Sequence, residues 1–304
     1  MDTWTPLSPS LLPVLAQLLP PSDFCDLTVG NLWLWREHLS VCLSEAEDFT
    51  CLRLRLMDGR EAFYPLTPTD PAPTARLLGV CETEGIPLRL FPLTDAQKDA
   101  LLRAYPRAVA ESAQAQADYL YDAEALATYK GRRYNGQRNH LNRFRAACPE
   151  ARLRAVESRD REGLLRLLGE CYDLSLPLHP ALAAERERLL LQVEGEEPWA
   201  GTPLVLAEGD LLFGLSVGEL VGEVAYIHTE KVPRRYGGAH QALVQATAAY
   251  YREQGARRIN REEDDGDAGL RRAKQALHPT SLARKWVVTV PTEQASPASV
   301  EREA

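Results

Sequence analysis

The order of strand and helix patterns between residues 151 and 290 constrains the fold of this chain more than any other feature. Three short strand patterns joined by turns predict an antiparallel meander, and a later strand-helix-strand order predicts a parallel crossover. The strand patterns lie at 151–156, 203–207, 211–217, 221–229, 257–261 and 285–290, and the helical patterns at 159–172, 181–193, 238–254 and 267–277. Together they predict an α/β fold, with a mixed and mostly antiparallel sheet covered by helices.

The first part of the chain shows a weaker version of the same order, which favours an internal duplication. Its strand patterns lie at 27–35, 39–43, 50–56, 62–66 and 87–91, and its helical patterns at 7–19, 74–84 and 94–105. Asp58-Gly59 is typical of a hairpin, and Thr94 with Gln97 is typical of a capped helix start. We therefore expect an N-terminal unit over residues 1–115, a C-terminal unit over 116–290 and a disordered tail over 291–304.

The composition indicates a cytoplasmic protein. The 304 residues carry a net charge of −8, with 45% apolar and 26% charged residues, and no stretch is apolar for long enough to cross a membrane. The apolar stretch near the start follows Asp2 and lacks the basic residues of a signal peptide. The cysteines are dispersed and form no C-x-x-C pair, so we expect buried reduced thiols and no metal site. They are Cys25, Cys42, Cys51, Cys81, Cys148 and Cys171.

A glycine-containing turn between a strand and a helix is the clearest candidate binding site. Gly237 and Gly238 let a ligand approach the backbone, and Ala239 opens the helix that follows. The free amides of a helix N-terminus bind anions, and Arg234 and Arg235 add positive charge. The alternative is that the two glycines only form a tight turn.

The strand before this turn carries the candidate catalytic groups. Acyl transfer to an amine needs a base and an acid, and Glu223 and His228 are the first choices for the base, with Tyr226 beside them. Strand alternation predicts Glu223 on one face and Tyr226 and His228 on the other. The alternative for each is an ordinary solvent-exposed position.

Two polar stretches are candidate substrate or anion sites. The first, residues 130–145, carries six basic residues and no acidic one, and it contains Arg132, Arg133, Arg138, Asn139 and Asn142. It could bind a polyanion or form a solvated helix face. The second contains Arg261, Glu262, Asp264 and, one helix further on, Lys274. Its carboxylates could bind a cationic amine, cap the next helix or solvate a loop.

The turn resembles the pyrophosphate loop of the Gcn5-related N-acetyltransferase superfamily through Arg234, Gly237 and Ala239 at the same spacing. That resemblance implies that the loop binds the pyrophosphate of coenzyme A or an acyl-coenzyme A. Several ordered blocks are also similar to a bacterial family named for the C-terminal domain of phosphatidylglycerol lysyltransferase. They include Cys25-Asp26 to Trp35, Asp118 to Tyr121, Gly131 to Tyr134, Arg138 to Phe144, Asn260 to Gly266, Gly269 to Lys274 and His278-Pro279. This second resemblance implies two tandem acetyltransferase-like units.

Two functions from different classes follow. The chain is an acyltransferase that moves an acyl or aminoacyl group from acyl-coenzyme A or aminoacyl-tRNA to an amine or hydroxyl, such as a small molecule or a lipid headgroup. Alternatively it is a non-catalytic binding module on the same scaffold, which is favoured by Leu277 where the family often has the tyrosine that would serve as acid. An extended basic surface would favour tRNA, and a narrow cleft at the glycines would favour coenzyme A. We expect a monomer.

Overall fold

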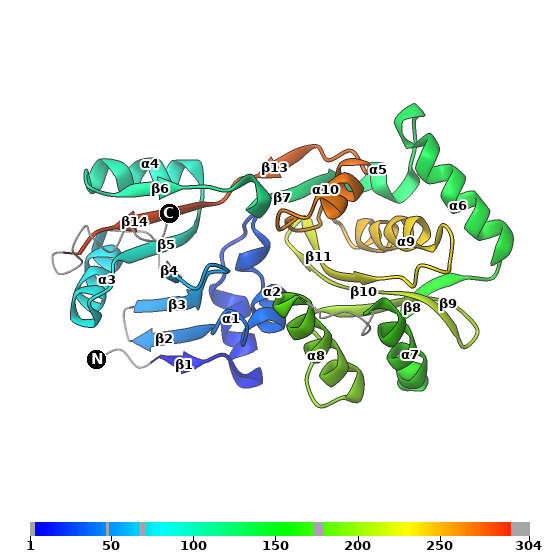
Figure 1. The fold of residues 1–304 in the computed structure, drawn as a ribbon, viewed down its shortest axis with the longest axis horizontal. Coiled ribbons are helices and arrows are strands. Elements are labelled where there is room, and N and C mark those ends of the chain that lie inside the picture. The colour runs from blue at the N-terminus through cyan, green and yellow to red at the C-terminus, as the bar shows by residue number, and fades with distance from the viewer. Residues whose placement is uncertain (1–3, 47–48, 67–70, 173–178, 293–304) are drawn as a thin grey trace. The chain divides into compact units, whose positions relative to one another are not determined.

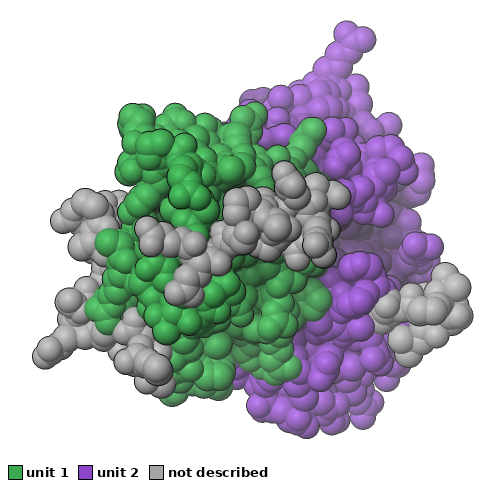
Figure 2. Space-filling view, turned by 60° about the vertical axis from the view of Figure 1, so that its left-hand side comes forward, with its two compact units in different colours: residues 1–20, 35–116, 284–304 green, residues 21–34, 117–283 purple. Residues whose placement is uncertain are grey.

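The computed structural model describes residues 4–46, 49–66, 71–172 and 179–292. The chain divides into two compact units, coloured separately in Figure 2. Unit 1 comprises residues 1–20, 35–116 and 284–304, and unit 2 comprises residues 21–34 and 117–283. Most of the tail expected to be disordered lies outside the described residues.

The sheet of unit 1 contains seven strands in the described part of the chain. Its order is β1-β2-β3-β4-β5-β14-β6, and only β4 and β5 pair in parallel among the pairs described. The strands are β1 (Thr5–Pro6), β2 (Cys42–Ala46), β3 (Phe49–Arg55), β4 (Glu61–Pro65), β5 (Leu88–Leu93), β6 (Val109–Glu111) and β14 (Trp286–Val290). The helices are α1 (Leu12–Leu18), α3 (Pro71–Glu84) and α4 (Asp95–Ala104). Thr94 and Gln97 form the predicted capping box at the start of α4.

The sheet of unit 2 repeats this pairing pattern with seven described strands in the order β13-β7-β12-β11-β10-β9-β8. Here β11 and β12 form the parallel pair, and the other described pairs are antiparallel. The strands are β7 (Asp118–Asp122), β8 (Arg152–Ala155), β9 (Thr202–Glu208), β10 (Leu211–Val221), β11 (Val224–Lys231), β12 (Arg258–Asn260) and β13 (Ser281–Ala283). The prediction of mixed, mostly antiparallel sheets covered by helices is therefore confirmed.

Helices cover both faces of the unit 2 sheet (Figure 1). One buried cluster joins the sheet to α5, α6 and α9 through residues such as Leu126, Phe144 and Leu243, and another joins its other face to α7 and α8 through Leu168 and Leu189. The helices are α5 (Ala123–Thr128), α6 (Asn135–Ala147), α7 (Arg161–Cys171), α8 (Pro180–Glu194), α9 (Ala239–Glu253) and α10 (Ala268–Gln275). Ala239 and Ala242 of α9 are buried in the first cluster.

Each unit is built from segments that are separated in the sequence, whereas the expected boundaries at 115 and 290 divide the chain into consecutive pieces. The last predicted strand becomes β14 and pairs with β5 and β6 of unit 1. Strand β7, for which the sequence showed no strand pattern, pairs with β12 and β13 in unit 2. Backbone hydrogen bonds between distant segments decide these memberships, and such pairing has no local sequence pattern.

The prediction of a strand over residues 27–35 is wrong, because this segment forms helix α2 (Val29–Trp35). Its valine and tryptophans favour a strand, but the short apolar run fits a buried helix equally well. Thr28 acts as the helix cap: its hydroxyl oxygen accepts from the amide of Asn31 at 3.3 Å, and its carbonyl accepts from the amide of Leu32 at 3.1 Å. This capping signal distinguishes the helix from a strand.

Candidate functional site

The parallel strands β11 and β12 diverge at the centre of unit 2. Their pairing extends only to Tyr226 opposite Asn260. Strand β11 continues to Lys231, whereas β12 ends at Asn260. Beyond the last backbone pair, side chains join the two segments: His228 contacts Glu262, and Glu230 forms an ion pair with Arg261. The divergence therefore places a set of buried charges next to the start of α9.

His228 lies in this divergence and is enclosed by carboxylates. Val217 pairs with Thr229 and Gly218 pairs with Ile227, so His228 is the extra residue of a β-bulge, which redirects a side chain. Its ring nitrogens lie 3.0 Å from Glu219 Oε1 and 2.8 Å from Glu262 Oε1, and its side chain is completely buried.

The carboxylates determine the charge of this imidazole. Burial by itself lowers the pKa of His228, but the hydrogen bonds to Glu219 and Glu262 outweigh burial and raise the pKa to about 9. The same interaction lowers the pKa of Glu219 against the opposing effect of burial. His228 is consequently a positively charged group near neutral pH, with both ring nitrogens occupied.

Segment 21–34 completes the surroundings of His228. The amide of Gly30 donates to Glu219 Oε1 at 2.6 Å, and Asn31 Nδ2 donates to Glu262 Oε1 at 3.1 Å. Glu262 has a positive φ of 57°, which is uncommon for a residue other than glycine. The Asn260 side chain holds this conformation by accepting from the Glu262 amide at 2.6 Å.

A thiol and two carboxylates gather beside this network. Cys25 Sγ lies 3.3 Å from Asp118 Oδ1 and 3.2 Å from Glu263 Oε2, and these three residues each offer an atom within 4.8 Å of the others. Cys25 and Asp118 are buried, and the cysteine amide also donates to Asp118 at 2.7 Å. The six cysteines are free, as predicted, and three of them are only partly buried.

Asp264 and Lys274 form part of the internal framework of unit 2. Asp264 is fully buried and accepts from Tyr119 Oη at 2.7 Å and from two nitrogens of Arg271 at 2.8 and 2.7 Å. The hydrogen bonds from Arg271 lower the pKa of Asp264 to about 2. The ammonium of Lys274 donates to the carbonyls of Arg261 and Glu263, and burial lowers its pKa.

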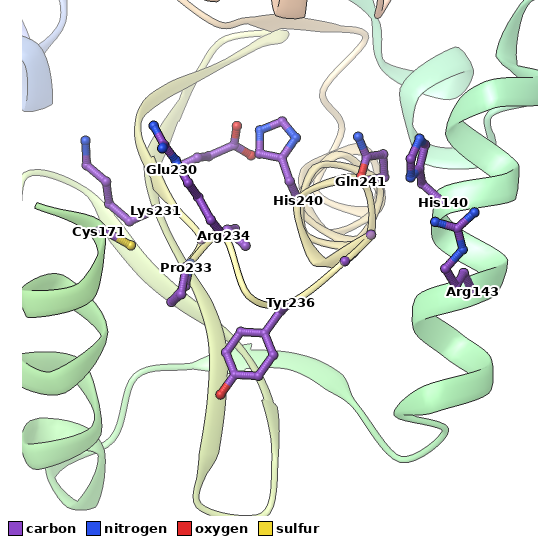
Figure 3. A pocket seen from close by; sticks show the side chains of 13 residues that line it. His140, Arg143, Cys171, Glu230, Lys231, Pro233, Arg234, Tyr236, His240 and Gln241 are labelled. Carbon is purple, nitrogen blue, oxygen red and sulfur yellow. The ribbon is translucent and has the colours of Figure 1, made fainter. Parts of the chain in front are cut away.

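The predicted glycine turn opens into a cavity of about 500 Å³ at the start of α9 (Figure 3). Its walls come from α6, the end of α7, the end of β11, the turn and the first residues of α9. The lining residues are His140, Arg143, Cys171, Glu230, Lys231, Val232, Pro233, Arg234, Tyr236, Gly237, Gly238, His240 and Gln241. The turn that the sequence predicted as a ligand site therefore borders a cavity, and α6, α7, β11 and α9 supply the other walls.

Each glycine of the turn has a different role. Gly238 has a φ of 87° and lies so close to α6 that a Cβ atom would come within 2.2 Å of the His140 carbonyl oxygen. At Gly237 a Cβ atom would meet nothing within 4 Å. Gly238 therefore permits close helix packing, and Gly237 leaves the cavity open.

The unpaired charge at the cavity is positive. Lys231 donates to Glu185 at 2.6 Å, and Glu230 is neutralised by Arg261. Among the residues that the structure describes, Arg143 and Arg234 have no side-chain partner, and both are exposed. An unpaired arginine pair beside a helix N-terminus suits a bound anion.

Helix α6 extends this positive surface away from the cavity. Arg132, Arg133, Asn139, Asn142 and Arg145 are exposed along α6 and the turn before it. Arg138 is the exception, because its guanidinium donates to the carbonyls of Tyr129 and Gly131 and to Asn135 Oδ1. It holds the chain entering α6 rather than facing solvent.

Several predicted site residues lie away from the cavity. Glu223 occupies the turn before β11, where it is exposed and pairs with Arg257 at 3.0 Å. The Tyr226 hydroxyl donates to the Ser22 carbonyl. Arg235 pairs with Glu170 at 2.9 Å, and the amide of Ala239 donates to the Tyr236 carbonyl at 3.2 Å. The four predicted residues Glu223, Tyr226, Arg235 and Ala239 are not among the described residues that line the cavity.

Sequence reasoning missed several polar residues of the cavity wall, among them His140, Glu230, Lys231, His240 and Gln241. His240 directly follows Ala239, the last residue of the predicted turn, and this position could have identified it as a cavity residue. Leu277, which stands where a tyrosine was expected, is buried in the core next to α9. No described helix has the length and apolar character needed to cross a membrane.

Comparisons with known proteins agree with this architecture. Residues 20–289 match the family described as "Phosphatidylglycerol lysyltransferase, C-terminal". A conserved protein of unknown function from Bacteroides thetaiotaomicron has a similar structure, with 24% identity, a TM-score of 0.85 and coverage of 96% of this chain and 100% of the other.

Two further structures carry a related name. L-PGS from Bacillus licheniformis has 11% identity and a TM-score of 0.69, covering 100% of this chain and 98% of the other. The C-terminal domain of a putative lysylphosphatidylglycerol synthetase from Agrobacterium fabrum has 14% identity and a TM-score of 0.61, covering 96% and 95%. These likenesses concern the fold. No curated protein sequence matches the chain.

Proposed function

Because this chain belongs to the phosphatidylglycerol lysyltransferase C-terminal family, we propose that it transfers an acyl or aminoacyl group, with the phosphate of the donor bound in the cavity at the start of α9. The observation that carries the proposal is the cavity itself, which combines an open glycine at Gly237 with Arg143 and Arg234, two arginines whose side chains have no partner among the described residues. Backbone amides and arginines together form a preorganised site for a phosphate.

The donor that fits best is an aminoacyl-tRNA. The cavity is continuous with α6, which contributes His140 and Arg143 to its wall and carries further exposed basic residues. A row of exposed arginines on a protein of net charge −8 is a local exception, and it suits a phosphodiester backbone that extends beyond one pocket. A coenzyme A donor would need only the cavity and would leave the basic residues of α6 without a role.

The acceptor is an amine or a hydroxyl, and phosphatidylglycerol is the first one to test because the family is named for it. The nucleophile of the acceptor would attack the carbonyl carbon of the donor ester. The protein must hold the donor so that this carbonyl faces the acceptor, and it must remove the acceptor proton.

Binding of the donor tests the proposal first. Isothermal titration calorimetry with bulk aminoacylated tRNA should give micromolar binding to the wild-type chain, and Arg234→Glu or Gly237→Glu should weaken it at least about tenfold, because each puts a carboxylate where a phosphate would lie. Parallel titrations use coenzyme A and acetyl-coenzyme A.

Arg235→Glu is the matched control. It makes the same change in net charge one residue away, at a side chain that pairs with Glu170 outside the cavity. Equal weakening by Arg235→Glu and Arg234→Glu would mean that tRNA responds only to overall charge. Binding of coenzyme A alone would replace the proposed donor.

A non-catalytic binding module is the second candidate function. It is favoured by the complete burial of His228 and the core position of Leu277, since neither can reach a substrate. Tight binding of aminoacylated tRNA without transfer to any amine or hydroxyl acceptor would support this candidate.

A further inference from the structure

Two histidines line the cavity, His140 and His240. His240 differs from His140, which is exposed on α6, because its imidazole is partly buried and lies near the charge of Glu230. It lies in the first turn of α9 and lines the cavity beside Arg143 and Arg234. Within the described residues, its ring nitrogens make no hydrogen bond. His228, in contrast, is completely buried, and both of its ring nitrogens contact carboxylates. Of His228 and His240, only His240 can contact a ligand in the cavity.

Glu230 lies between the His240 ring and the buried guanidinium of Arg261. The Glu230 carboxylate points toward the His240 ring from the end of β11 (Figure 3). Arg261 holds that carboxylate from the segment after β12, and both partners of this ion pair are largely buried. The pair therefore fixes the direction of the carboxylate, as a third group orients the base in many acyltransfer sites.

We propose that His240 is the general base of the transfer reaction and that Glu230, held by Arg261, is its positioning residue. This inference rests on the proposed function. The acceptor hydroxyl or amine gives its proton to His240 as its oxygen or nitrogen bonds to the carbonyl carbon of the donor. The ester bond to the donor sugar then breaks, and the departing oxygen takes the proton from His240, so that the imidazole is neutral again.

The electrostatic surroundings suit this role. Burial lowers the pKa of His240, Arg261 lowers it further and Glu230 opposes them. The N-terminus of α9 also disfavours a positive charge in its first turn. The ring is therefore neutral and able to accept a proton near pH 7, and Glu230 stabilises the imidazolium once it forms. The other charged or titratable groups that line the cavity are His140, Arg143, Cys171, Lys231, Arg234 and Tyr236.

The first experiment measures the protonation of His240 directly. NMR titration of the full chain labelled with 15N-histidine, with the signal assigned by its loss in His240→Gln, should show a pKa below 6.5. Glu230→Gln should lower this pKa further, because it removes the opposing charge and leaves Arg261. A His240 that is protonated at pH 7 would overturn the proposal.

The second experiment separates binding from proton transfer. Single-turnover transfer from bulk aminoacylated tRNA to vesicles of phosphatidylglycerol and phosphatidylcholine should slow at least about 100-fold in His240→Gln. The dissociation constant for the tRNA should stay within about twofold. The wild-type rate should rise with pH through the pKa of His240 and then level off, and the variant should lose that step.

His38→Gln is the control, because His38 lies in unit 1 and outside the cavity. An unchanged rate and pH profile in His240→Gln would overturn the base assignment while leaving the proposed function intact. Loss of tRNA binding in His240→Gln would make it a binding residue instead. If the wild-type chain neither binds nor transfers, the proposed function fails and this inference fails with it.

Discussion

Replacing His228 with leucine is expected to lower the free energy of unfolding by roughly 3–5 kcal/mol, because it leaves two carboxylates facing each other in the interior. In the wild-type protein the charged imidazole joins Glu219 at 3.0 Å and Glu262 at 2.8 Å. Differential scanning calorimetry measures the change. Glu223→Gln is the control, since Glu223 pairs with Arg257 on the surface, where an ion pair contributes about 1 kcal/mol or less.

The same cluster gives a pH dependence with a definite sign. The folded-state pKa of His228 is about 9 and its ordinary value is 6.5, so the folded protein binds this proton more tightly. The contribution is fully present below pH 6.5 and is lost as the pH rises through 9. A pKa difference of this size corresponds to about 3 kcal/mol.

The variant provides the internal check on this pH dependence. Melting temperatures of the wild-type protein should fall across the interval from pH 6.5 to 9, and those of His228→Leu should lack this part of the fall. An identical alkaline profile in both proteins would mean that His228 is not charged in the folded state.

Replacing Gly238 with valine is expected to lower the free energy of unfolding by roughly 2–5 kcal/mol. A Cβ atom there would lie 2.2 Å from the His140 carbonyl oxygen, and the φ of 87° strains any L-residue with a side chain. The backbone of α6 cannot rotate away as a side chain could, so α6 and α9 must separate. Urea unfolding monitored by circular dichroism measures the loss.

The adjacent glycine is a matched control for this prediction. Gly237 lacks the positive φ, and a Cβ atom there would meet nothing within 4 Å. Gly237→Ala should therefore stay within about 0.5 kcal/mol of the wild-type protein. Similar losses in both variants would contradict the assigned contact with α6. The contrast also explains why a carboxylate at position 237 can test ligand binding without unfolding unit 2.

Local sequence patterns predicted the elements that depend on neighbouring residues. The Thr94–Gln97 cap and the Asp58-Gly59 turn appear where expected. The buried alanine face of α9 and the turn at Gly237 and Gly238 were also predictable, because a turn and an amphipathic helix are specified within a few residues. The positive charge of residues 130–145 was also evident from the sequence. The sequence did not show which of these arginines would hydrogen-bond within the protein.

The candidate site beyond the turn could not be read from the sequence in the same way. Arg138 and Arg143 belong to one basic stretch, but only the structure shows that Arg138 is bound by backbone carbonyls while Arg143 lines the cavity. His228 was predicted as a candidate base from its place on a strand. The structure shows that it lies at a β-bulge and that both of its ring nitrogens contact carboxylates, those of Glu219 and Glu262. These surroundings depend on tertiary contacts.

By itself, the sequence determined the class of fold, most helices and strands, and the position of the glycine turn, because these follow from periodicity, capping and backbone freedom over short stretches. The tertiary structure decided that segment 21–34 joins unit 2 and that β14 joins unit 1. It also brought Asn31 to Glu262 across 231 positions and Cys25 to Glu263 across 238. Such contacts form because buried polar and charged groups need hydrogen-bond partners, and distant segments supply them. A local sequence pattern does not identify those partners.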